Sequence, residues 1–153
     1  MVVAQNCGLC RVDPANVLVR GARAMLLVPN APHVSIRDGG HLLVTTMRHV
    51  QSRVDFSDEE AREVHQLTVQ AARALLNLAW ANWINFQENG NWSVDTPAGP
   101  HSHTHVYGRW RGSTNQPFGE PLRLPTSAEL LATPVPVASP PEITALRRAL
   151  AES

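Results

Sequence analysis

Three histidines alternate within five residues of this chain, at His101, His103 and His105. In a β-strand, residues two apart point to the same face, so this spacing predicts one row of imidazoles about 7 Å apart. Imidazole is suited to act as an acid, a base, a nucleophile or a metal ligand near neutral pH. Histidine supplies only 7 of the 153 residues. The alternation therefore favours a functional role for these histidines over their chance occurrence on a solvent-facing strand.

Two cysteines stand three positions apart, at Cys7 and Cys10, in a loop-like segment before the first predicted strand. In a cytosolic protein, Cys-x-x-Cys is more typical of a metal site or a redox pair than of a structural disulfide. The cysteines alone leave both uses open, and the choice depends on which other side chains reach them.

The elements that must position these side chains include several short strands. The run from residue 17 to residue 28 is broken at Gly21, which predicts two strands joined by a turn. Residues 41–46 are β-branched and apolar enough to predict a third strand. Residues 83–87 and 101–108 alternate with period two and predict a hairpin with a long loop. The second strand of this hairpin would carry the histidine row.

One long amphipathic helix is predicted near residues 58–79. Ser57 and Glu60 have the spacing of a capping box, and the helix dipole favours acidic residues in the first turn. Apolar residues then recur at spacings of three and four: Val64, Leu67, Ala71, Ala74, Leu75 and Leu78. This stripe can lie across a sheet, so the sequence predicts an α+β fold.

The C-terminal part of the chain has a different composition. Residues 112–141 are rich in proline, glycine and serine, which predicts an extended arm, and Glu142–Leu150 can form only a short closing helix. We therefore predict a domain over residues 1–112 and an extension over residues 113–153 that packs on this domain or prolongs it.

Charge and composition exclude several classes of function. The 13 basic and 13 acidic side chains balance, so the chain lacks the basic surface that binding to polymeric nucleic acid requires. Every basic residue is arginine, which excludes a Schiff-base lysine and the lysine of a Walker phosphate loop. No apolar run approaches the roughly 18 residues of a membrane span, and the first residues lack the basic stretch and apolar run that are typical of a signal peptide. We expect a soluble, cytoplasmic protein that does not bind membranes.

The run His101-Ser-His-Thr-His105, followed by Val-Tyr, resembles the His-x-His-x-His-x-x signature of the histidine triad family. Residues 6–10 are similar to the Cys-x-x-Cys opening of many bacterial members. Residues 40–44 and 47–50 are similar to the family's Gly-His-x-Leu-Val and Lys-x-His-Ile segments. The resemblance covers about residues 6–109 and leaves the C-terminal arm unmatched.

This resemblance implies a fold and an enzymatic activity. The implied fold is an antiparallel sheet of about five strands with one long helix and a short C-terminal helix, usually paired into a homodimer. In the implied reaction, His103 attacks the α-phosphorus of a purine nucleotide that carries a phosphoramidate or a second nucleotide. A nucleotidyl-histidine forms and is then discharged to water or another acceptor. His105 would bond the phosphate oxygen or the leaving group.

The resemblance also implies a structural zinc ion held by Cys7, Cys10, His49 and His101. Two thiolates and two imidazoles suit a closed tetrahedral site. A thioredoxin-like redox pair is the alternative for the cysteines, but no βαβ pattern surrounds them. As a zinc ligand, His101 would fix the strand that carries His103 rather than act in catalysis.

The loop before the triad departs from the family pattern. Many members have a Gly-Gln-Ser-type stretch there that grips the phosphate, whereas this chain has residues 95–100 with two prolines that lack backbone N–H groups. Phosphate binding would then fall to Thr96, Gly99 and Asn89, with Asn91 as a further candidate.

Other substrate contacts are expected from the ends of the strands. His41 would lie near the same pocket, although a histidine beside a glycine is equally typical of a strand start. The family often contacts ribose through an acid at the end of the second strand, where this chain offers Asn30 and His33. Arg109 would replace the arginine that usually follows the triad.

Four tryptophans are candidates for packing or for base stacking. Trp80 and Trp83, at the end of the long helix, are expected in the core or in a dimer interface. Trp92 and Trp110 flank the triad in the sequence, so they could pack in the same way or stack on a base.

Two alternatives to a zinc-stabilised hydrolase remain at this stage. The altered phosphate loop is compatible with a nucleotide-binding module that has little or no catalytic activity. The three triad histidines could instead all bind an open catalytic zinc ion, which would leave the cysteines outside the site.

Overall fold

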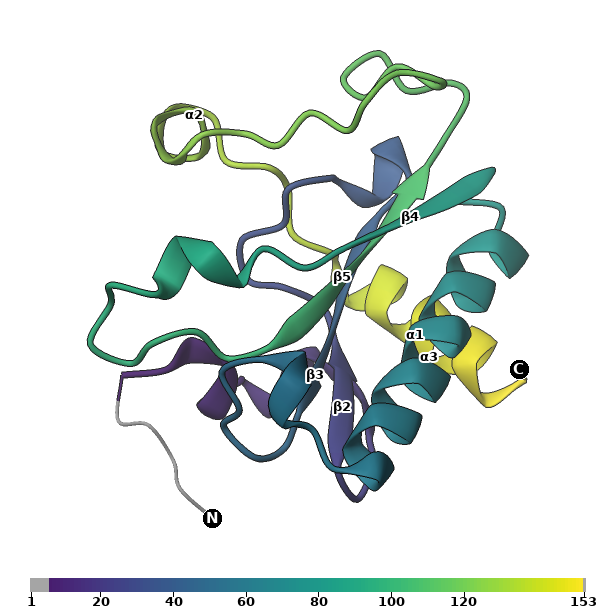
Figure 1. Ribbon diagram of the computed structural model, residues 1–153. Helices are drawn as coiled ribbons and strands as arrows, with labels where there is room; N and C mark the ends of the chain where they lie inside the picture. Colours follow the sequence, from purple (N-terminus) through teal and green to yellow (C-terminus); the bar gives the residue numbers. More distant parts are fainter. Residues whose placement is uncertain (1–5, 153) are drawn as a thin grey trace.

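A computed structural model describes residues 6–152 of the chain. Its centre is one five-stranded antiparallel sheet with the strand order β1-β2-β3-β5-β4 (Figure 1). The strands are β1 (Val17–Arg20), β2 (Ala24–Leu27), β3 (His41–Thr46), β4 (Trp83–Gln87) and β5 (His103–Arg109). The helices are α1 (Asp58–Asn77), α2 (Ser127–Ala132) and α3 (Pro140–Ala151). The α+β fold with about five strands is confirmed.

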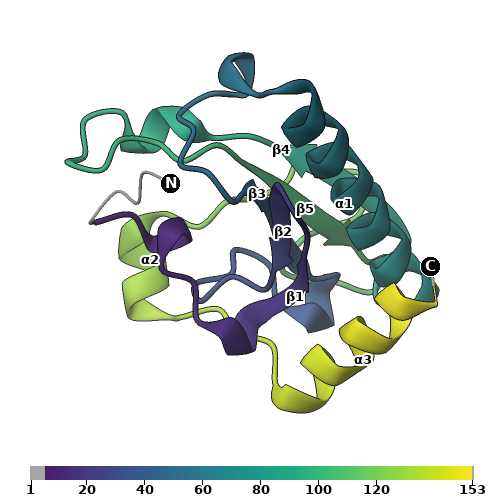
Figure 2. The ribbon, with the colours of Figure 1, turned by 90° about the horizontal axis from the view of Figure 1, so that it is seen from below.

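Helices α1 and α3 cover one face of the sheet (Figure 2). Helix α1 begins at the predicted capping box, where Ser57 Oγ accepts from the Glu60 amide and the Glu60 carboxylate accepts from the Ser57 amide. Its apolar stripe packs against alternate residues of β2, β3 and β5. Together with three residues of α3 they form the main core: Ala24, Leu26, Leu42, Val44, Val64, Leu67, Ala71, Ala74, Leu75, Val106, Leu146, Ala149 and Leu150.

The opposite face of β3 and β5 carries most of the polar chemistry. Antiparallel pairing places His41 opposite Tyr107, Leu43 opposite His105, and Thr45 opposite His103. Because side chains alternate along a strand, these residues point away from α1 while their neighbours enter the core. Strands β3 and β5 thus contribute side chains to the core on one face and to the histidine row on the other.

His101 does not belong to β5, although the period-two pattern predicts a strand from residue 101. The last ladder pair is Thr45 with His103. Before it, the Ser102 amide donates to the Val50 carbonyl, and the Thr45 hydroxyl donates to the Ser102 carbonyl. These bonds divert the chain from the ladder, so the ring of His101 leaves the row of His103 and His105.

The C-terminal arm, predicted over residues 112–141, occupies residues 110–139 between β5 and α3. Polar contacts tie it to the domain. Buried Arg109 donates to the carbonyls of Pro117 and Glu120, and Asp38 accepts from Ser113 and Asn115. The composition of the arm predicts only extended chain, yet it contains the short helix α2. A second capping box, between Thr126 and Glu129, starts this helix. Within residues 6–152, no helix has the length and apolar character needed to cross a bilayer.

Candidate active site and metal site

A cavity of about 420 Å³ opens on the sheet face opposite α1. Its walls come from the N-terminal segment, the chain after β2, and the loop before β5, which lie together on the side away from α1 and α3 (Figure 1). The cavity brings together the predicted residues Asn30, His41, Thr96, Gly99, His103 and His105. Among the described residues, no Asp, Glu, Lys or Arg lines it.

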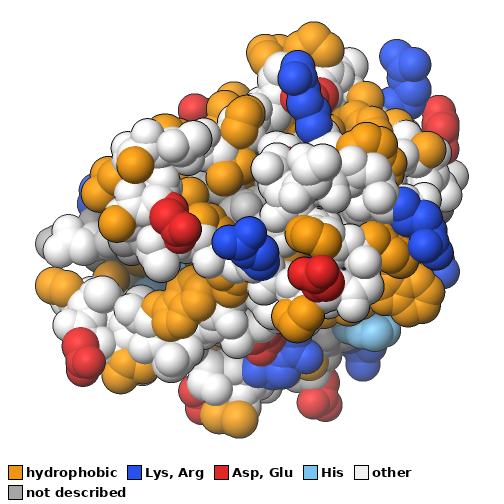
Figure 3. Space-filling model, turned by 90° about the horizontal axis from the view of Figure 1, so that it is seen from above, with side chains coloured by type: hydrophobic (Ala, Val, Ile, Leu, Met, Phe, Trp, Pro, Cys, Tyr) orange, Lys and Arg blue, Asp and Glu red, His pale blue; other side chains and the backbone are white. Residues whose placement is uncertain are grey.

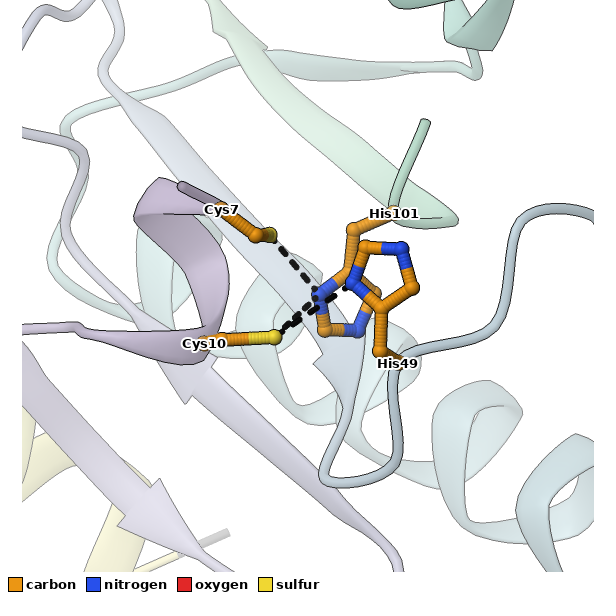
Figure 4. A group of neighbouring side chains, drawn as sticks. All are labelled: Cys7, Cys10, His49 and His101. Carbon is orange, nitrogen blue, oxygen red and sulfur yellow. Dashed lines mark hydrogen bonds between the residues drawn. The ribbon is translucent and has the colours of Figure 1, made fainter. Parts of the chain in front are cut away.

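Cys7, Cys10, His49 and His101 meet at one side of this cavity (Figure 4). One potential ligand atom from each lies within 4.8 Å of the others. Both histidines direct Nδ1 at sulfur: Cys7 Sγ is 3.4 Å from His101 Nδ1, and Cys10 Sγ is 3.4 Å from His49 Nδ1 and 3.6 Å from His101 Nδ1. The four residues come from three separate segments, so a metal ion here would join all three.

The donor set fits zinc. A tetrahedral zinc ion binds sulfur at about 2.3 Å and nitrogen at about 2.0 Å. This geometry places a ligand sulfur and a ligand nitrogen about 3.5 Å apart, which agrees with the Sγ to Nδ1 distances given above. His101 Nε2 lies 3.1 Å from the Thr46 carbonyl and donates to it, so the lone pair of this ring lies on Nδ1 and faces both sulfurs. Burial, followed by the neighbouring His49, lowers the pKa of His101 to about 4, which keeps the imidazole neutral as a ligand must be.

Three further histidines, His41, His105 and His103, form a hydrogen-bonded chain across the cavity floor. His41 Nε2 is 2.9 Å from His105 Nδ1, and His105 Nε2 is 3.1 Å from His103 Nε2. At the two ends, the backbone N–H of His33 donates to His41 Nδ1 at 3.0 Å, and His103 Nδ1 is 2.7 Å from the carbonyl of His101. The order of these contacts determines where the protons lie.

A neutral imidazole has one N–H group and one lone pair. Because His41 Nδ1 accepts from a backbone N–H, its proton lies on Nε2 and is donated to His105 Nδ1. His105 therefore carries its own proton on Nε2 and donates it to His103 Nε2. His103 in turn donates its Nδ1 proton to the His101 carbonyl. His103 Nε2 is therefore the unprotonated nitrogen at the end of the chain, and its lone pair accepts from His105 until a substrate oxygen takes over that N–H group.

Burial keeps His41 and His105 neutral. It lowers the pKa of His105 to about 3, with smaller contributions from His103 and His33. It also lowers the pKa of His41 well below the ordinary value, and the nearby His105, His33 and His103 add to this effect. Loss of hydration penalises the charged form of an imidazole. The hydrogen-bond order described above requires the same neutral state.

His33 is a larger part of the site than the sequence indicates. The family pattern points to it only as a neighbour of Asn30 at a position for ribose contact. Its ring stacks on His41 at 5.0 Å between centroids and lies 5.5 Å from His105. Its Nδ1 is 2.7 Å from the hydroxyl of Tyr107. The pairing of His41 with Tyr107 in the ladder brings these groups together, and no local motif encodes that pairing.

Three predicted substrate contacts, Arg109, Asn89 and Asn91, lie outside the cavity lining. The guanidinium of Arg109 donates to arm carbonyls at 2.8 and 3.0 Å, so it holds the arm. Asn89 does not line the cavity either, and its amide nitrogen is buried without a hydrogen-bond partner among residues 6–152. Of the predicted phosphate contacts in this loop, Thr96 and Gly99 reach the cavity.

The tryptophans separate into one partly buried and three exposed members. Trp80 packs against the main core, as expected, but Trp83 is 66% exposed on the edge strand β4 and is not part of the core of this chain. Trp92 is also exposed, and its ring centroid lies 6.2 Å from that of His33, near the cavity. Packing of Trp83 in a dimer stays a prediction.

Comparison with known proteins gives the following relatives. No protein-family model matches the chain. Over 76 residues, half of this chain, the sequence is 33% identical to an enzyme of Mycobacterium tuberculosis named AP-4-A phosphorylase. The chain spans 39% of the length of the curated relatives that it matches.

Two solved structures illustrate the likeness in fold. A zinc-bound histidine triad family protein from Mycobacterium smegmatis aligns over 97% of this chain and 96% of its own, with a TM-score of 0.68 and 21% identity. Plasmodium falciparum diadenosine triphosphate hydrolase, in complex with Cyclomarin A, aligns over 93% of this chain and 80% of its own, with a TM-score of 0.63 and 17% identity. The resemblance inferred from the sequence motifs is thereby confirmed in three dimensions, and the chain has the fold of the histidine triad family.

Proposed function

We propose that this protein is a zinc-stabilised nucleotide hydrolase or nucleotidyltransferase. It attacks the α-phosphate of a purine nucleotide conjugate, either a dinucleoside polyphosphate or a phosphoramidate. The observation that carries the proposal is the ordered histidine chain, which leaves His103 Nε2 unprotonated and places the N–H group of His105 3.1 Å from it. The names of the M. tuberculosis and P. falciparum relatives support the substrate class.

In the first half of the reaction, His103 Nε2 forms a bond to the α-phosphorus while the bond to the leaving group breaks. The leaving group departs with the electron pair and takes the Nε2 proton of His105. In the second half, water attacks the nucleotidyl-histidine and gives a proton to His105. The nucleotide is released and both histidines return to their starting states.

The environment of His103 supports this role. Its Nδ1–H group is held by the His101 carbonyl, which fixes the ring orientation and stabilises the positive charge that develops as Nε2 bonds to phosphorus. Because neither lysine nor arginine is in the cavity lining described above, the phosphate would be bound by neutral donors. Thr96 and the backbone near Gly99 are the predicted donors that reach the cavity.

Zinc, held by Cys7, Cys10, His49 and His101, would have a structural role. When bound, it supplies a cross-link between the N-terminal segment, the loop after β3 and the start of β5. The zinc-bound neighbour from M. smegmatis and the four-residue cluster support the identity of the metal. By holding the ring of His101, the cluster would also steady the carbonyl that orients His103.

A homodimer is part of the same proposal. Strand β4 forms one edge of the sheet, and two large apolar side chains on it are exposed, Trp83 at 66% and Phe86 at 51%. An unpaired strand edge with exposed aromatic residues is suited to pairing with a second chain. The oligomeric state in solution, measured by analytical ultracentrifugation, tests this part.

A binding module without turnover is the second candidate. It is favoured by the lack of a cationic side chain in the described cavity lining, because charge stabilisation of the phosphate is often a large catalytic contribution. The two candidates agree on nucleotide binding and differ in chemistry.

The test compares the wild type with His103→Ala on diadenosine triphosphate and adenosine phosphoramidate. We expect turnover in the wild type and a loss of about 10³-fold or more in the variant, because the nucleophile is removed. His65→Ala, at an exposed histidine of α1, is the matched control and should retain full activity. AMP binding by calorimetry without turnover of either substrate would favour the binding module. Equal turnover in wild type and His103→Ala would refute the mechanism.

A further inference from the structure

A second cavity, of about 490 Å³, lies next to the first. It is lined by residues between 33 and 38 and by parts of the C-terminal arm between residues 115–125 and 129–136. His33 lines both cavities. In Figure 3, histidine atoms are visible deep in a hollow of the surface. The two cavities therefore meet at one imidazole, on the side of the site where His105 would protonate a leaving group.

The walls of the second cavity are held by specific hydrogen bonds. The buried side chain of Gln116 bonds both backbone groups of Arg123: its Nε2 donates to the carbonyl at 2.7 Å, and its Oε1 accepts from the amide at 3.0 Å. Asp38 anchors the same stretch through the hydroxyl of Ser113 at 2.6 Å and the amide of Asn115 at 3.2 Å. Such a scaffold gives a largely preformed pocket, as ligand sites usually are.

The two cavities differ in charge. Among the described residues, the first cavity is lined by no Asp, Glu, Lys or Arg, whereas the second is lined by Arg123 and by the carboxylates of Asp38 and Glu129. Arg123 is the only arginine that lines either of them. Apolar groups lie around it, including Val34, Leu124 and Pro125. An apolar wall next to a guanidinium suits a nucleoside attached to phosphates, because the base is buried and the phosphate oxygens meet a positive charge.

We propose that the second cavity binds the distal nucleoside of a dinucleoside polyphosphate. In this arrangement Arg123 faces the polyphosphate chain and His33 lies where the chain passes from one cavity to the other. The inference rests on the proposed function for the first cavity. It adds a leaving-group subsite built by the C-terminal arm, which a phosphoramidate with a small leaving group would leave empty.

The test separates ligands that reach the second cavity from those that do not. Calorimetry on the zinc-loaded full chain compares diadenosine triphosphate with AMP for Arg123→Gln and for Ala132→Trp, which fills the cavity from α2. Each variant should weaken binding of diadenosine triphosphate by about tenfold, the order expected for one charge-assisted contact, and change AMP binding by less than twofold.

Two matched substitutions control for effects on the fold. Arg37→Gln and Ala128→Trp make the same chemical changes at nearby exposed positions that line neither cavity, so they should leave both affinities unchanged. If Arg123→Gln and Ala132→Trp affect both ligands equally, or neither ligand, the subsite is refuted. These titrations are made in the His103→Ala background, so that diadenosine triphosphate stays intact and the result is independent of whether the protein turns over any substrate. A wild type that binds both ligands without turnover would contradict the enzymatic proposal alone.

Discussion

The molecule holds two histidine clusters that begin two residues apart on one segment and differ in their partners. His101 faces two cysteines and His49, whereas His103 faces a chain of imidazoles that includes His105 and His41. In the first cluster, lone pairs converge on one point, which suits a cation. In the second, each ring donates its proton to the next, and the unprotonated nitrogen at the end of the chain is His103 Nε2. The difference teaches that the partners of each histidine, and not the triad pattern, determine its chemistry.

The largest expected effect in the first cluster comes from Cys7→Ser. It should abolish stoichiometric zinc binding, because a closed four-ligand site loses one thiolate. A ligand at 1,000 times its dissociation constant stabilises the folded state by about 4 kcal/mol, so a loss of this order is expected in the free energy of unfolding. Metal analysis and denaturant unfolding measure both quantities. Retained zinc would favour a metal site on the triad instead.

A change in the second cluster should leave zinc untouched and reduce catalysis. His41→Phe removes the group that donates to His105 Nδ1, so the proton of His105 is no longer confined to Nε2. Loss of such an orienting partner typically costs about 10-fold to 100-fold, and we expect this decrease in kcat with little change in KM. His65→Phe, at an exposed position of α1, is the control. A large rise in KM with unchanged kcat would show that His41 binds substrate rather than orients His105.

The smallest effect concerns pH and distinguishes buried imidazoles from exposed ones. Folding lowers the pKa of His105 from 6.5 to about 3, mainly through burial. Between these values the unfolded chain binds a proton that the folded chain does not. The contribution to stability is therefore fully present above pH 6.5 and is lost as the pH falls toward 3.

Denaturant unfolding at several pH values measures this dependence. One proton contributes a slope of up to about 1.4 kcal/mol per pH unit. His105→Gln should reduce the slope between pH 6 and pH 4 by about 1 kcal/mol per pH unit, and His65→Gln should not change it. Acid loss of zinc affects wild type and variants alike, so it cancels in the comparison. An unchanged slope in His105→Gln would mean that the buried ring is protonated in the folded state.

Much of the fold follows from local patterns. The capping box at Ser57 and the spacing of apolar residues after it predict α1, because both depend on neighbours within one or two turns. The alternation in residues 83–87 predicts β4 with the bounds observed. Helix α2 is not evident from composition, since a capping box of two residues is a weak signal within a proline-rich stretch.

The sequence by itself determined which residue types were available for chemistry: alternating histidines, a Cys-x-x-Cys pair, and no lysine. The tertiary structure alone decided how these residues are grouped. The ladder between β3 and β5 ends at His103, so His101 turns toward the cysteines, and the pairing of His41 with Tyr107 brings His33 into the site. The physical reason is that these partners lie up to 94 positions apart in the chain. Only strand register and the path of the connecting loops bring their side chains within hydrogen-bond distance.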